Sequence, residues 1–240
     1  MQSSCNSLMF SNLSGRMITV LVGKKKKSFF AHESILVATS KFFRAALQDR
    51  WEENRGIIKL PDFDPEHFQH YLRLIYYGHI FSRPKPEDLK EETSPEWPIL
   101  INLYLLADYL MAEALKNLVI DIMISSVAQE KRYPVSLANI IYSKTDHGSP
   151  LRRLIVDFHI HCGKSFEHNS RVKGHDSNAS HIDFFRDLVF AFSAASQDIW
   201  KPDRTSPWKQ DPCQYHEHTD GARCKDKAGE ESARTAQSDK

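Results

Sequence analysis

Residues 30–43 read FAHESILVATSKFF and place a strand signal directly before two helix signals. The aromatic residues before His32 favour a strand, and His32 then opens a helix. Ser40 stands at the N-cap of a second helix, where its hydroxyl can accept a hydrogen bond from a backbone N–H of the first turn. We expect His32, Leu36 and Phe43 to be largely buried, with Leu36 and Phe43 pointing into the core. The stretch therefore predicts two short helices that follow a strand directly.

A β-hairpin is expected before this stretch. Residues 18–22 read ITVLV, a β-branched run, and Gly23 with four lysines separates them from residues 28–31. Residues 56–60 predict a third short strand. The lysines at 24–27 have two interpretations, a nuclear localisation patch or a solvated hairpin tip, and their place in a turn favours the second.

The rest of the chain reads mainly as helices. Asp64 and Pro65 are typical of a helix start, and Gly78 of a helix end. Residues 99–127 predict two helices with a break near Met111. Three weaker helical patterns follow at residues 136–143, 151–162 and 181–197.

Composition divides the chain further. We expect a flexible N-terminus at residues 1–15, a folded domain at 16–128 with a Pro-rich loop at 81–98, and a helical extension at 129–199. Residues 200–240 predict a mostly disordered tail, because Val, Ile, Leu, Met and Phe are absent after position 200 and little surface can be buried.

Charge and composition exclude several classes of protein. The 240 residues carry 32 basic and 31 acidic side chains, a net charge of +1 that gives no reason to expect a nucleic-acid partner. No apolar run is long enough to span a bilayer. Four scattered cysteines, at 5, 162, 213 and 224, fit reduced thiols. We therefore expect an intracellular protein, in the cytoplasm, the nucleus or both.

Residues 18–127 resemble a BTB/POZ domain, and the segment LADYL at 106–110, before a second amphipathic helix, is most similar to BTB proteins of filamentous ascomycete fungi. The resemblance implies an α+β fold, in which a cluster of helices flanks a small mixed sheet, here with a short all-α C-terminal extension. The residues that carry the motif are His32, Leu36, Ser40, Phe43, Tyr76 and Gly78.

The resemblance implies a protein–protein interaction module, with a homodimer as the family expectation. Its best-defined role is substrate adaptor for cullin-3 ubiquitin ligases through an apolar-x-Glu motif, and Trp51 and Glu53 match this motif. The alternative is a cullin-independent scaffold or nuclear co-regulator that acts by homo- or hetero-oligomerisation. Trp51 is in that case a side chain that covers the domain's own core.

Catalytic motifs are absent from the sequence, and we do not expect an enzyme or a required cofactor. Two groups of metal-ligand residues remain. Cys213, His216, His218 and Cys224 have the donor types and close spacing of a small zinc site, although chance clustering in a solvated tail is the simpler interpretation. His159 and Cys162 share a helix face, where partly buried structural roles are favoured.

Overall fold

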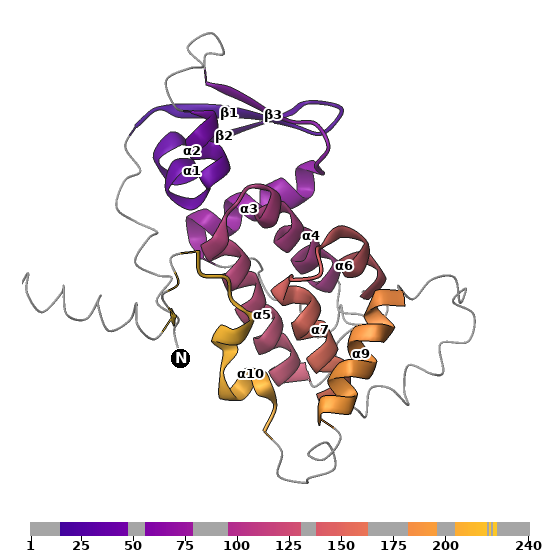
Figure 1. Ribbon diagram of the computed structural model, residues 1–240. Helices are drawn as coiled ribbons and strands as arrows, with labels where there is room; N and C mark the ends of the chain where they lie inside the picture. The colour runs from indigo at the N-terminus through magenta and orange to yellow at the C-terminus, as the bar shows by residue number, and fades with distance from the viewer. Residues whose placement is uncertain are drawn as a thin grey trace, which may run out of the picture. The chain divides into compact units, whose positions relative to one another are not determined.

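The computed structural model describes residues 15–47, 56–78, 96–130, 138–162, 182–195, 205–219, 221 and 223–224 (Figure 1). The chain divides into two compact units. The first combines residues 1–92 with 99–119 and 218–240, and the second combines residues 93–98 with 120–217.

A three-stranded mixed sheet forms one layer of the first unit. Strand β1 (Met17–Val22) lies in the centre, with β2 (Lys27–His32) antiparallel on one side and β3 (Ile57–Leu60) parallel on the other. Alternate residues of a strand point to opposite faces. The inner face buries Ile18, Val20, Val22, Ala31, Ile58 and Leu60.

The predicted hairpin joins β1 to β2. Gly23, with φ 75°, and Lys26, with φ 52°, adopt the left-handed backbone of the turn, and the Lys26 N–H donates to the Gly23 carbonyl. The lysines at 24–27 are exposed, as expected for a solvated hairpin tip.

Helices α1 (Glu33–Thr39) and α2 (Lys41–Ala46) lie together on one side of the sheet (Figure 1). Helix α3 (Pro65–Tyr77) begins where Asp64 accepts a hydrogen bond from the Glu66 N–H. It ends at Gly78, whose φ of 71° is the left-handed conformation that glycine adopts without strain. The two predicted boundaries of this helix are therefore confirmed.

Helices α4 (Glu96–Tyr109) and α5 (Glu113–Glu130) follow, and the predicted break lies at Met111, with φ 50°. Helix α4 begins inside the segment that we predicted as a loop at 81–98, so residues 96–98 correct that boundary. Proline is tolerated in the first turn of a helix, where the N–H has no partner within the helix. Trp97 in this first turn is buried, and its burial stabilises the helical conformation of residues 96–98.

The second unit contains the predicted helical extension. Helices α6 (Ala138–Lys144), α7 (Pro150–His161) and α9 (Ile182–Ala195) match the three weak helical patterns, and α7 and α9 lie side by side (Figure 1). The buried Arg152 joins α7 to the end of α6, because its guanidinium donates to the Tyr142 carbonyl at 2.8 Å. Among the helices described, none combines the length and the apolar character needed to cross a membrane.

Part of the predicted tail is folded. Helix α10 (Pro207–Gln210) and the 3₁₀ helix η5 (Pro212–Tyr215) bury Trp208, Cys213 and Tyr215. The sequence lacks aliphatic residues here, but two aromatic rings supply the apolar surface instead. The remaining part of residues 200–240 lies outside the described residues, as do residues 1–14.

Candidate functional site

A hydrogen-bonded pair joins the start of α1 to α3. The Tyr76 hydroxyl accepts from the His32 backbone N–H at 2.9 Å and lies 2.8 Å from the His32 ring Nδ1. The hydroxyl can donate to that nitrogen when it accepts from the backbone. His32 is only partly buried, whereas Leu36 and Phe43 are fully buried in the core as expected.

Ser40 lies at the predicted N-cap of α2. Its Oγ accepts from the Phe43 N–H at 3.1 Å and donates to the Leu110 carbonyl at 2.6 Å. The serine is 1% exposed, so both bonds form away from water. Ser40 therefore connects α2 to the turn between α4 and α5.

The outer face of the sheet exposes apolar side chains. Phe30 on β2 and Ile57 on β3 both pair with Thr19 of β1, so the two lie in one row across the sheet. Phe30 is 65% exposed and Ile57 41%. Met17, two residues before Thr19 on β1, is 48% exposed. We call Met17, Phe30 and Ile57 the outer sheet face. Exposed apolar surface of this kind is typical of protein contacts.

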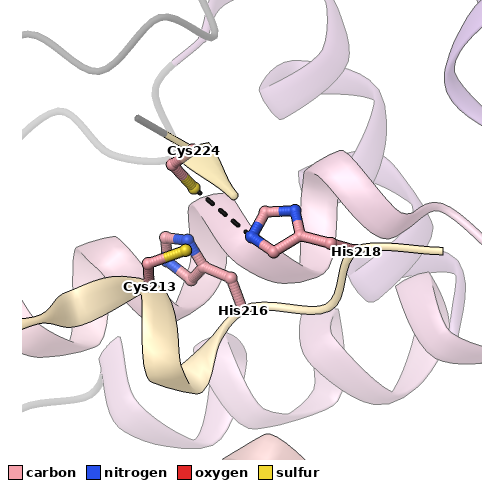
Figure 2. Close-up of side chains that lie close together, drawn as sticks. All are labelled: Cys213, His216, His218 and Cys224. Atoms are coloured by element: carbon pink, nitrogen blue, oxygen red, sulfur yellow. Dashed lines mark hydrogen bonds between the residues drawn. The ribbon is translucent and has the colours of Figure 1, made fainter. Parts of the chain in front are cut away.

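The structure brings together the four C-terminal metal-ligand candidates. One donor atom each from Cys213, His216, His218 and Cys224 lies within 4.8 Å of the other three (Figure 2). The Cys224 Sγ is 3.5 Å from the His218 Nε2. Cys213 is buried, and the other three are partly buried.

Hydrogen bonds to neighbouring side chains hold the segment at residues 213–216 in place. The His216 Nε2 lies 3.1 Å from Asp121 Oδ1 on α5. The Asp211 side chain accepts from the Cys213 N–H, and the Tyr215 hydroxyl donates to Asp157 Oδ2 on α7. Burial, with the nearby carboxylate as a further cause, raises the pKa of Tyr215 far above its usual value. The phenol therefore stays protonated and remains a donor.

Comparison with known proteins identifies the first part of the chain. Residues 11–126 match the family model of the BTB/POZ domain. The chain contains a BTB/POZ domain. BTB domains are typically non-catalytic modules of protein binding and oligomerisation, and the mixed sheet with its helices is the α+β BTB fold.

Solved structures of two BTB domains are similar to this chain. The BTB domain of zebrafish PATZ1 is 18% identical, with a TM-score of 0.33, and the match covers 45% of this chain and 75% of that one. The BTB domain of human Gigaxonin is 17% identical, also with a TM-score of 0.33, and the match covers 44% and 75%. A search of curated proteins found no match.

Trp51 and Glu53 lie outside the described residues. They fall within the BTB domain, between the end of α2 at Ala46 and the start of β3 at Ile57. Their role in cullin binding stays a prediction from the sequence.

His159 and Cys162 lie beyond the matched BTB residues. His159 is buried and Cys162 is partly buried. Neither belongs to a group of three or more metal-ligand side chains in the described parts of the chain. The His159 Nδ1 lies 2.8 Å from the Ile155 carbonyl, and burial lowers the pKa of His159 to about 4. Burial also raises the pKa of the Cys162 thiol to about 11. Both side chains are therefore held in their neutral forms.

Sequence reasoning missed the carboxylates that contact the cysteine–histidine segment, Asp121 on α5 and Asp157 on α7. Asp121 is the clearest case, since it is far from His216 in sequence and α5 gives no motif around it. A spaced Cys/His pattern indicates ligands, but no local signal indicates the carboxylate that orients one of them.

Proposed function

We propose that this protein is a substrate adaptor for a cullin-3 type ubiquitin ligase, which it binds through its BTB domain. The observation that carries the proposal is the position of Trp51 and Glu53. They form an apolar-x-Glu motif between α2 and β3 of a BTB domain.

This residue pair has the chemistry of a docking motif. Aromatic side chains supply much of the binding free energy at interfaces because they bury a large area at low entropic cost. A carboxylate next to such an anchor adds orientation and discriminates against partners of the wrong charge. A tryptophan with an acidic residue two positions later combines both properties.

An adaptor also needs a second surface for its substrate, and α9 of the helical extension supports this part of the proposal. One stripe of the helix carries Ile182, Phe185, Val189 and Phe192, all exposed. Phe184 is buried from the same helix and stacks edge-on against Tyr142 and His159. The helix is thus held by one side, while its other side offers apolar contacts.

Calorimetric titration of the full chain with the N-terminal domain of cullin-3 tests the proposal. We expect saturable binding that Trp51→Ala or Glu53→Lys reduces at least tenfold, a loss of about 1.4 kcal/mol or more. Glu52→Lys is the matched control, because it changes the net charge equally at the neighbouring position outside the motif. Absence of binding by the folded wild-type chain would exclude the adaptor role.

A cullin-independent scaffold that acts by oligomerisation is the second candidate function. The outer sheet face favours it, because three exposed apolar side chains lie on one sheet of the BTB domain. Either function fits an intracellular location, in the cytoplasm or the nucleus, which the scattered cysteines support. The similarity to BTB proteins of fungi remains a prediction of the sequence.

A further inference from the structure

We propose that Cys213, His216, His218 and Cys224 bind one zinc ion, and that this ion holds the C-terminal segment 205–224 in its folded conformation. The proposal is independent of cullin binding. It rests on the distances between the donor atoms, on the backbone that presents them and on the contacts behind them.

The distances are close to those of a tetrahedral zinc site. Zinc–sulfur bonds of about 2.3 Å and zinc–nitrogen bonds of about 2.0–2.1 Å at tetrahedral angles place neighbouring donor atoms about 3.3–3.8 Å apart. The Cys224 Sγ and His218 Nε2, at 3.5 Å, already have this separation. All four donor atoms lie within 4.8 Å of one another. Binding therefore requires shifts of about 1 Å, which side-chain rotation supplies.

The local backbone explains why the side chains converge. Cys213 and His216 are three residues apart across the 3₁₀ helix η5, and residues at this spacing lie on the same side of a 3₁₀ helix. His216 itself has extended backbone, with φ −93° and ψ 154°. Residues two apart in an extended chain also point to the same side, and His218 follows His216 at this spacing.

A turn then leads back to the fourth ligand. The Gly221 N–H donates to the His218 carbonyl at 3.1 Å, and Gly221 has a φ of 74° that favours glycine. Beyond this turn, the Cys224 thiol faces the His218 ring (Figure 2). The four ligands thus come from one short helix, one extended step and one turn within residues 213–224.

The surroundings of His216 also fit a metal ligand. A zinc-bound histidine usually donates its second ring N–H to a carboxylate or carbonyl, which fixes the tautomer and the direction of the ring. The His216 Nε2 contacts Asp121 Oδ1 at 3.1 Å, and in this arrangement Nδ1 would be the ligand atom. Asp121 would therefore be a positioning residue for this ligand.

The donor set favours zinc over other cations. Two thiolates and two imidazoles are the ligands of structural zinc sites, whereas calcium and magnesium take oxygen ligands. Zinc also explains how this segment folds. Its apolar core is limited to a few side chains such as Trp208 and Tyr215, and metal-binding free energy adds directly to folding free energy in such segments.

The first experiment measures metal content and coordination in the full chain, purified under reducing conditions. We expect one zinc per chain by elemental analysis. After zinc removal, we expect cobalt(II) to give the intense visible absorption of a tetrahedral site with two thiolates. A spectrum of octahedral cobalt, or no cobalt spectrum at all, would overturn the proposal whether or not any variant folds.

Variants then assign the ligands. We expect Cys213→Ser and Cys224→Ser each to weaken zinc binding by more than about a hundredfold, and Asp121→Asn by about tenfold, as for other second-sphere carboxylates. Cys162→Ser is the matched control and should keep full affinity, because this thiol lies outside the cluster. Equal zinc content in the Cys213, Cys224 and Cys162 variants would overturn the proposal, as would a stable Cys213–Cys224 disulfide under reducing conditions.

Discussion

The hydroxyl of Ser40 connects two parts of the BTB domain that lie far apart in sequence. It accepts from the Phe43 N–H in the first turn of α2 and donates to the Leu110 carbonyl in the turn between α4 and α5. A hydroxyl is suited to this position because it can donate and accept at once. An alanine here would leave a buried donor and a buried acceptor without this partner.

We expect Ser40→Ala to lower the free energy of unfolding by about 2–4 kcal/mol, because it removes the N-cap bond from the Phe43 N–H and the buried bond to the Leu110 carbonyl. Urea denaturation measures this change. Ser143→Ala is the control, because its hydroxyl also donates to a backbone carbonyl, that of Ile140, but in an exposed place. Equal effects of the two substitutions would contradict the role assigned to Ser40.

His159 makes the stability of the helical extension depend on pH. Its pKa is lowered to about 4 because burial disfavours the charged ring, which packs 4.6 Å from the Phe184 ring. In the unfolded chain the ring titrates near pH 6.5. Between these two values the unfolded chain binds the proton that the folded chain excludes, so the folded state loses stability as the pH falls from about 6.5 to 4.

We therefore expect His159→Gln to lose less stability than the wild type over this pH range, by up to about 3 kcal/mol. Urea denaturation followed by tryptophan fluorescence at several pH values measures the difference. Parallel pH profiles for the two proteins would show that His159 does not titrate in this way.

At the scale of elements, the segment with α10 and η5 adds to the core of the second unit. The Trp208 ring meets the Phe158 ring of α7 edge-on, with centroids 4.8 Å apart, and the Arg153 guanidinium donates to the Gln214 carbonyl. The Trp97 ring also meets the Phe158 ring edge-on, with centroids 6.3 Å apart. Composition alone predicts little stability from residues 200–240, whereas these contacts indicate that the segment stabilises α7.

We expect removal of residues 205–240 to lower the free energy of unfolding by about 3 kcal/mol or more, because Phe158 and its neighbours lose a buried tryptophan. Removal of residues 225–240 alone is the control and should have little effect. Trp208→Ala separates packing from metal binding, because it leaves all four candidate ligands in place. Urea midpoints equal to that of the full chain for both truncations would contradict this contribution.

At the scale of the whole molecule, the outer sheet face is the surface that distinguishes the two candidate functions. A lone exposed apolar residue is ordinary on a protein surface. Phe30 and Ile57 instead lie in one row on either side of Thr19, with Met17 on the same face. If the BTB domain forms a homodimer, this face has the apolar character that such an interface needs.

We expect the full chain to form a dimer that the double variant Phe30→Thr/Ile57→Thr converts to a monomer. Threonine keeps the strand propensity of both positions and removes the apolar contacts. Light scattering after size-exclusion chromatography measures the mass. Phe185→Ser, on the exposed side of α9, is the control, and a monomeric wild type at micromolar concentration would exclude the dimer.

Local sequence signals were sufficient for most element boundaries. Ser40, Asp64 with Pro65, Gly78 and the break at Met111 all lie where the chain predicts them, because caps, proline and glycine act on the backbone within a few residues. The predicted loop at 81–98 fails at its end, since Trp97 is buried against Phe158, a residue about sixty positions later. No local pattern contains that partner.

The sequence by itself determined the α+β domain, the helical extension and the donor types of the candidate metal site. Only the tertiary structure decided which distant groups meet: Tyr76 with His32, Asp121 with His216, and Phe158 with Trp208. The physical reason is the range of the interactions. Helix caps and strand patterns depend on residues that are close in sequence. The partner of a buried ring, or the carboxylate that contacts a histidine, depends on how elements far apart in the chain pack together.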